Sequence, residues 1–222
     1  DSSLEGNEQS LSTYSNTVTT NQKRLAVRDT GKFANSKVLY NFRSTALDLL
    51  KTQYAELIDA DIFSALSPTT GTHAYWQADT ATSVYASSDP VATLVAGDLI
   101  TLDDISAMKT IAQIGGAANY RMRPIRVDGQ DYYVLVVHPE VAYSLFTLAG
   151  WQTAQREAQN RGDSNPLFTG SLGVWDGVVI HSHEGVVNGT NGGSGAIPFA
   201  RNLFMGAQAA CFAENSDMMW VE

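Results

Sequence analysis

The stretch from Ser36 to Leu66 constrains the fold most, because apolar residues recur there every three or four positions with no Gly or Pro. That spacing predicts one long amphipathic helix. Asn35 or Ser36 can cap its start, and Ser67-Pro68 ends it. At 1.5 Å per residue the helix would extend about 45 Å, longer than a typical globular helix. Its broad apolar face favours packing against a sheet, with a coiled-coil strand or a bundle helix as the alternatives.

The composition is that of a globular chain with a substantial core. Its 222 residues are 44% hydrophobic and 17% charged, which excludes a disordered tail and allows one large or two small domains. No apolar run approaches the roughly 18 residues that span a bilayer, and no signal peptide is visible in DSSLEGNEQS. Cys211 is the single cysteine, so we expect no internal disulfide and an inert, buried thiol, as in a reducing cytoplasm.

Charge is distributed unevenly along the chain. Residues 21–51 carry seven basic and two acidic side chains, a balance of +5, so a net charge of −9 leaves −14 for the remainder. The acidic total argues against tight nucleic-acid binding. A basic N-terminal part and an acidic remainder could attract each other between identical subunits and orient a head-to-tail contact. The alternative is an ordinary solvated surface.

Residues 4–34 are polar and contain two alternating stretches, LSTYSNTVT and KRLAVRD, which predict the two strands of a long hairpin. Such a ribbon is marginally stable alone in water, so it needs another surface to lie on. That surface belongs either to its own domain or to a neighbouring subunit.

The middle of the chain carries local signals for three elements. Residues 67–100 are loop-like, with Trp76 and Tyr85 as anchors. Thr101 to Asp104 resembles a capping box that opens a helix ending at Gly115-Gly116. Asp128-Gly129 then predicts a type I′ hairpin, whose second strand, YYVLVVH, is apolar on both faces and should lie centrally in a sheet.

The C-terminal half alternates between helical and strand-like patterns. Pro139 should begin a helix that runs toward Leu148 and closes at Gly150. The remaining expectations are a helical segment at 151–160, a strand at 174–181 broken by Asp-Gly, a flexible loop at 187–198 and a buried strand at 203–213. Without a regular βαβ rhythm, this order indicates an α+β fold with an antiparallel or mixed sheet.

The cluster His181-Ser182-His183-Glu184 is the one group with metal-ligand residue types. On a strand the two imidazoles would share a face and, with Glu184, could bind Zn²⁺ in a metal-dependent enzyme. Histidines at a polar strand end are the alternative. The sequence has no G-x-S-x-G nucleophile elbow, so catalysis has little support.

Several sequence blocks resemble a known family. They are NPLFTGSLGVWDGVVIHSHEGV (165–186), preceded by WQTAQREAQNRG and followed by ARNLFMGAQAA, together with HPEVAYSL (138–145) and LEGNEQSL (4–11). In this order, over most of the chain from Leu4 to about residue 210, they resemble the major capsid proteins of podovirus-like tailed bacteriophages. That family belongs to the Hong Kong 97-type coat lineage.

The resemblance implies a structural protein with no cofactor. It implies self-assembly into the pentamers and hexamers of an icosahedral shell around double-stranded DNA, without sequence-specific binding and without a membrane. Scaffolding, portal or decoration proteins would be further partners, the virion the location, and the bacterial cytoplasm the site of synthesis. An encapsulin-like cellular shell protein with the same fold is the alternative.

The resemblance also implies a division of the α+β fold. An extended hairpin arm would occupy 1–34, a peripheral domain with a long spine helix 35–125, a mainly axial domain 126–213, and a return toward the peripheral domain 214–222. The polar stretch 188–195 would face a local symmetry axis. Subunit contacts are expected in the arm, at Leu4, Asn7, Tyr14, Lys23, Arg24, Arg28 and Lys32.

Overall fold

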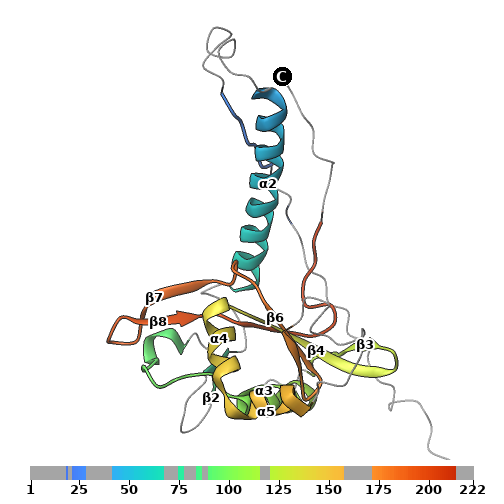
Figure 1. Ribbon diagram of the computed structural model, residues 1–222, viewed down its shortest axis with the longest axis vertical. Helices are drawn as coiled ribbons and strands as arrows, with labels where there is room; N and C mark the ends of the chain where they lie inside the picture. The colour runs from blue at the N-terminus through green and yellow to red at the C-terminus, as the bar shows by residue number, and fades with distance from the viewer. Residues whose placement is uncertain are drawn as a thin grey trace, which may run out of the picture.

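The computed structural model describes residues 19, 22–28, 42–67, 75–77, 84–86, 90–115, 121–157 and 172–213. Over these ranges the chain forms an α+β body from which one long helix, α2 (Phe42–Leu66), projects (Figure 1). The α+β class predicted from the pattern of elements is therefore confirmed.

Helix α2 confirms the predicted helix over residues 42–66, while the predicted start at Asn35 or Ser36 lies outside the described residues. Its end is also as predicted, because the backbone N–H and the hydroxyl of Ser67 both donate to the carbonyl of Phe63, at 3.1 and 2.8 Å. The prediction that this helix packs along a sheet was wrong. The helix stands away from the sheet, and Leu49 is 58% exposed.

A mixed sheet forms the centre of the body. Its longest strand, β4 (Gln130–Val137), pairs in parallel with β6 (Val178–Ser182) on one side and antiparallel with β3 (Ile125–Val127) and β9 (Leu203–Met205) on the other. Strand β5 (Gly173–Trp175) pairs with the outer edge of β6. The central position predicted for YYVLVVH is confirmed, because β4 has neighbours on both edges.

Two Asp-Gly turns with the same geometry join strands of this sheet. Asp128 and Gly129 have φ values of 49° and 81°, which confirms the type I′ turn between β3 and β4. Asp176 and Gly177 have φ values of 45° and 75°. The stretch expected as one interrupted strand is therefore a second hairpin, β5–β6, and its turn carries the same signal.

Three helices cover the sheet face that points away from α2 (Figure 1): α3 (Leu102–Ile114), α4 (Pro139–Thr147) and α5 (Ala149–Glu157). The capping box at Thr101 and the left-handed cap at Gly115 are confirmed for α3. The core between helices and sheet consists of Leu102, Ile105, Ala112, Tyr133, Leu135, Val137, Ala142, Leu145, Trp151, Val178 and Ile180.

Pro139 begins α4 as predicted, with His138 as its N-cap, but closure at Gly150 was wrong. The helix ends at Thr147 because Leu148 adopts an extended conformation, and Gly150 lies inside α5. A Cβ at Gly150 would lie 3.0 Å from Leu102 Cδ1. The glycine therefore permits close packing of α5 on the start of α3 and does not end a helix.

Two small hairpins were missed by the sequence patterns. Strands β1 (Tyr75–Gln77) and β2 (Val84–Ala86) pair within the stretch expected to be loop-like, with Trp76 opposite Tyr85. Strands β7 (Asn188–Gly192) and β8 (Ile197–Ala200) pair where a flexible loop was expected, so that prediction was wrong. The β7–β8 hairpin is anchored to the short 3-10 helix η1 (Pro90–Thr93), since Gly193 N–H donates to Val91 O at 2.8 Å.

The prediction of a long buried strand at 203–213 was also wrong. Only Leu203–Met205 forms a strand, after which Ala207 N–H donates to Arg123 O and Gln208 takes a positive φ of 61°. The chain then leaves the body, so that Phe212 is 65% exposed and Cys211 is exposed as well. The expectation of a buried thiol is therefore overturned.

Candidate subunit-contact surfaces

The predicted contact residues fall into two groups. Leu4, Asn7, Tyr14 and Lys32 lie outside the described residues, whereas Lys23, Arg24 and Arg28 lie in the described segment 22–28. We call this segment the basic segment. Figure 1 shows it as a straight stretch of chain beside α2, and every residue in it is exposed. No strand pairing of the basic segment is found among the described residues, so the hairpin arm stays a prediction.

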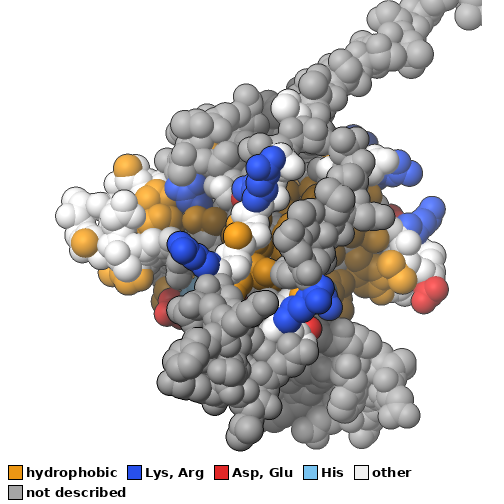
Figure 2. Space-filling model, turned by 90° about the horizontal axis from the view of Figure 1, so that it is seen from above, with side chains coloured by type: hydrophobic (Ala, Val, Ile, Leu, Met, Phe, Trp, Pro, Cys, Tyr) orange, Lys and Arg blue, Asp and Glu red, His pale blue; other side chains and the backbone are white. Residues whose placement is uncertain are grey.

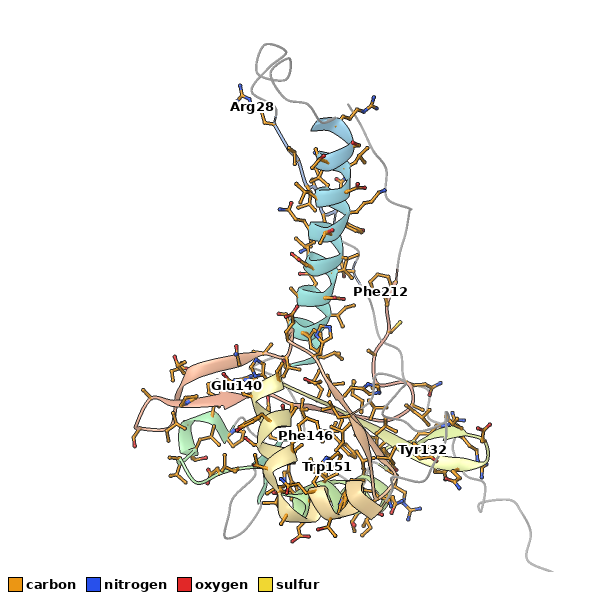
Figure 3. The ribbon with its side chains drawn as sticks, viewed as in Figure 1. Arg28, Tyr132, Glu140, Phe146, Trp151 and Phe212 are labelled. Atoms are coloured by element: carbon orange, nitrogen blue, oxygen red, sulfur yellow. The ribbon has the colours of Figure 1, made fainter. Side chains whose placement is uncertain are left out.

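Lys23 makes its contact within its own chain. Its ammonium group lies 2.8 Å from Asp61 Oδ2, and the two side chains are 42% and 52% exposed. An exposed ion pair of this kind contributes at most about 1 kcal/mol, so it orients the segment more than it stabilises the fold. Figure 3 shows the consequence: Arg28 lies near the end of α2 that is remote from the sheet.

We expect the two arginines of the basic segment to lie on the side away from α2. Successive side chains of an extended chain point in opposite directions, so Arg24 and Arg28 oppose the side that carries Lys23. The guanidinium of Arg24 donates to Gln22 Oε1 at 2.8 Å. In that arrangement the segment would present two guanidinium groups outward, and Lys23 joins it to α2.

Other exposed apolar side chains lie far from the basic segment. Val127, on the β3–β4 hairpin, is 50% exposed, and Tyr143 and Phe146, on α4, are 71% and 38% exposed. Figure 3 shows that hairpin, marked by Tyr132, and α4, marked by Phe146, on different sides of the body. In Figure 2, viewed from the side of α2, the described Lys and Arg side chains are separated by hydrophobic and neutral surface.

The histidine cluster is divided by the end of a strand. His181 belongs to β6, whereas His183 follows the strand, stacks on Phe63 with ring centroids 4.7 Å apart and accepts a hydrogen bond from Gly185 N–H. Glu184 is exposed. Within the described part of the chain, no group of three or more His, Cys, Asp or Glu side chains is placed to hold a metal ion.

Two contacts of α2 were not predicted by the sequence patterns. Phe63 and His183 are 120 positions apart, and Lys23 and Asp61 are 38 apart. Neither pair has a local signal, because the partners belong to elements that only the tertiary fold brings together. The stacking of Phe63 on His183 joins α2 to the body, and the Lys23–Asp61 pair joins the basic segment to α2.

Exposed charge and apolar surface on a projecting helix and hairpins are features of a protein that functions through contacts with other subunits. In the described ranges, no helix combines the length and apolar character needed to cross a membrane. The chain belongs to the phage capsid protein family, whose model matches residues 1–219. Membership of this family confirms the resemblance drawn from the sequence blocks.

Individual relatives agree with the family match. The chain is 27% identical over 252 residues to the major capsid protein of Pseudomonas phage KPP25, covering all of this chain and 67% of that protein. Its structure is similar to the capsid of Ralstonia phage GP4, with a TM-score of 0.70 and 29% identity over 93% of this chain. The chain spans 63% of the length of that GP4 capsid chain.

A more distant structure shares the fold. The capsid of cyanophage Pam1 superposes with a TM-score of 0.51 and 19% identity, over 68% of this chain and 48% of that chain. The described body therefore has the fold of phage capsid subunits.

Proposed function

We propose that the chain is the shell-forming part of a major capsid protein, which assembles into the pentamers and hexamers of an icosahedral shell around double-stranded phage DNA. The family match over residues 1–219 carries this proposal. The exposed helix and basic segment support it, because shell subunits use extended surfaces and not a pocket.

The finer architecture belongs to the same proposal. In a Hong Kong 97-type subunit, α2 is the spine helix of the peripheral domain, the basic segment is part of the extended arm, and the body around β4 is the axial domain. The boundaries expected from the sequence are 1–34, 35–125, 126–213 and 214–222, but α3 shares its core with β4, so we assign residues 102–114 to the axial domain. Projection of α2 from the body supports a division into a peripheral and an axial part.

The proposed partners follow from charge and family. A net charge of −9 fits a shell that encloses DNA without binding its sequence, and scaffolding, portal or decoration proteins are further partners. The protein would be made in the bacterial cytoplasm and reside in the virion, with no catalytic role. The similar proteins are phage capsids, which favours a phage shell over a cellular one.

Negative-stain electron microscopy of the natural full-length protein, with any chain that flanks residues 1–222, tests the proposal. We expect closed shells of uniform size, or flat rings of five and six subunits. Small soluble particles alone, even with a scaffolding partner coexpressed, would contradict it. Stoichiometric zinc in the purified protein would instead favour the enzyme alternative at His181 and His183.

A further inference from the structure

The β3–β4 hairpin projects from the body (Figure 1). Strand β3 pairs with β4 over Ile125–Val127 and Gln130–Tyr132, whereas β4 gains its second neighbour, β6, from Tyr133 onward. Among the described residues, the end of the hairpin is therefore a two-stranded ribbon with no further strand on either edge. Because such a ribbon is only marginally stable alone in water, we expect another surface to support it.

The ribbon has one charged face and one largely apolar face. Arg126 lies opposite Asp131, and the two side chains form an ion pair at 3.5 Å while remaining 74% and 53% exposed. Successive side chains of a strand point to opposite faces, so Ile125, Val127 and Tyr132 lie on the other face. Val127 is 50% exposed. An exposed apolar face on a projecting ribbon is suited to contact with another molecule.

A second exposed apolar surface lies on α4, on a different side of the body (Figure 3). Tyr143 and Phe146 are 71% and 38% exposed, and Glu140, whose side chain is 83% exposed, lies three positions before Tyr143. We call these three residues the α4 surface. Between positions 139 and 153, Glu140 is the single charged residue. Exposed aromatic side chains with few charges have the composition of the centre of a protein interface.

We propose that the β3–β4 hairpin of one subunit packs against the α4 surface of a second copy of this chain. The inference rests on the proposed capsid function and adds a subunit contact outside the N-terminal arm. Val127 packs against Tyr143 and Phe146, and Arg126 pairs with Glu140. Adjacent residues are about 3.3 Å apart along a strand, and residues three positions apart are about 4.5 Å apart along a helix. Both contacts therefore form in one arrangement.

The charges of the two surfaces are complementary. Arg126 has only the exposed ion pair with Asp131, which is weak because water competes for both groups. In the described part of the chain, the nearest cationic partner of Glu140 is His138, whose Nδ1 lies 3.9 Å from its carboxylate. Arg126 is suited to the contact because its planar group can donate two parallel hydrogen bonds to a carboxylate.

The placement of the two surfaces identifies the partner as a second copy of the chain. One subunit carries both halves of the contact, on different sides of its body, and offers the hairpin to one neighbour and the α4 surface to the other. Such a heterologous, head-to-tail contact closes into rings when the rotation between subunits permits, as pentamers and hexamers require. A two-fold dimer would instead join one surface to itself.

Engineered disulfides in the natural full-length protein test the contact. Cys211 is exposed, so Cys211→Ser, with any cysteine of the flanking chain also replaced, is the background. After oxidation of the assembled protein, Val127→Cys with Tyr143→Cys should give a covalent ladder up to five and six subunits. Val174→Cys with Tyr143→Cys is the matched control and should give no ladder, because Val174 is an exposed valine on β5, at the opposite edge of the sheet from β3.

Proteins with one engineered cysteine distinguish a head-to-tail contact from a two-fold contact. A coassembled mixture of the Val127→Cys and Tyr143→Cys proteins should give disulfide-linked heterodimers and nothing larger, while either protein alone should give no dimer. Disulfide-linked dimers formed by the Val127→Cys protein alone would indicate a two-fold contact and overturn the proposal.

A double-mutant cycle tests the pairing of Arg126 with Glu140. Arg126→Ala and Glu140→Ala should each raise the subunit concentration needed for half-maximal assembly about tenfold, which corresponds to about 1.4 kcal/mol. The double variant should show no larger increase than either single variant, because all three lack the same ion pair. Fully additive effects would show that the two residues do not pair.

The possible results distinguish this contact from the capsid function itself. If the unaltered protein forms neither rings nor shells, the proposed function is overturned and the contact with it. If the unaltered protein assembles, the contact alone is overturned when the test pair of cysteines gives no ladder or the control pair gives the same ladder. If the cysteine variants do not assemble in reducing buffer, the double-mutant cycle decides, and additive effects or none overturn the contact.

Discussion

Asp104 offers the sharpest test of how the body of the molecule is held together. Its carboxylate is 2% exposed and accepts hydrogen bonds from the backbone N–H and hydroxyl of Thr101, at 2.8 and 2.7 Å, and from Trp76 Nε1 at 3.3 Å. It therefore closes the N-terminus of α3 and connects β1 to it. Asp104→Ala would remove the acceptor for all three donors.

The cost of Asp104→Ala follows from these contacts. Loss of the capping interaction costs about 1 kcal/mol, and the poorly solvated N–H groups of Thr101 and Trp76 add about 1–2 kcal/mol each. Removing a buried carboxylate also removes its desolvation cost. We therefore expect the free energy of unfolding to fall by about 3 kcal/mol, the lower end of the sum of these terms. With a urea dependence of about 2 kcal/mol per M, the unfolding midpoint should fall by about 1.5 M.

Urea unfolding of the unassembled subunit, followed by tryptophan fluorescence, measures this change. Asp103→Ala is the matched control because Asp103 is the exposed neighbour in the same first turn of α3. It loses only a favourable interaction with the helix dipole, about 0.5 kcal/mol. If Asp104→Ala is no more destabilising than Asp103→Ala, the carboxylate does not hold α3 and β1 in the way described.

Three further predictions concern other parts of the molecule. Gly193→Ala should lower the free energy of unfolding in urea by more than about 2 kcal/mol, because Gly193 has a φ of 57° and an added Cβ would clash with Leu94 O in the β7–β8 region. Gly195→Ala is the control: an added Cβ there has no atom nearer than 3.7 Å, so the loss should be less than about 0.5 kcal/mol. Burial, and then Asp131, raise the pKa of Tyr133, so the unfolded chain loses this proton first and stability falls as pH rises above about 10. Tyr133→Phe should lose about 1 kcal/mol at neutral pH, from the bond to Met122 O, and the difference from the unaltered protein should narrow above pH 10 if the sign is right. Hydrogen exchange should be faster in α2 than in β4 in the unassembled subunit and slow on assembly, whereas equal protection before assembly would contradict an exposed helix.

Features encoded within a few residues were predicted correctly. The capping box at Thr101, the cap at Gly115 and the turn at Asp128-Gly129 each depend on two to four adjacent residues. The central position of β4 also followed from its own composition, because a strand that is apolar on both faces has no side suited to water. For such elements the local sequence and the tertiary fold favour the same conformation.

Features that depend on distant partners were not predicted. The β7–β8 hairpin was expected to be a loop because NGTNGGSG has few strand-forming residues. Its ordering depends on Phe199, which packs over Gly189, and on the bond from Gly193 to η1. The prediction for the apolar run after Leu203 was wrong for the opposite reason. Its composition favours a strand, but the chain leaves the body after three strand residues. In both stretches tertiary context outweighed local propensity.

The assignment of Lys23, Arg24 and Arg28 to subunit contacts stays a prediction. The charge excess of residues 21–51 pointed to the basic segment, and the structure describes Lys23, Arg24 and Arg28 on it. What the sequence did not distinguish is that Lys23 pairs with Asp61 of the same chain. Residues adjacent in the sequence can face opposite directions on an extended chain, and which side meets α2 depends on a contact 38 positions away.

Because α2 is largely exposed, we expect its stability to depend on assembly. Between positions 43 and 66 the buried side chains are Ala46 and Leu50, which is little apolar burial for a helix of 25 residues. Most helical stability in proteins comes from packing of an apolar face and not from propensity, so α2 is expected to be weakly held in a single subunit. A neighbouring subunit that covers the exposed side of α2, where Leu49 lies, would supply the missing contacts. In that arrangement folding of α2 and assembly are coupled, because each contact made by a neighbouring subunit on α2 also stabilises the helix.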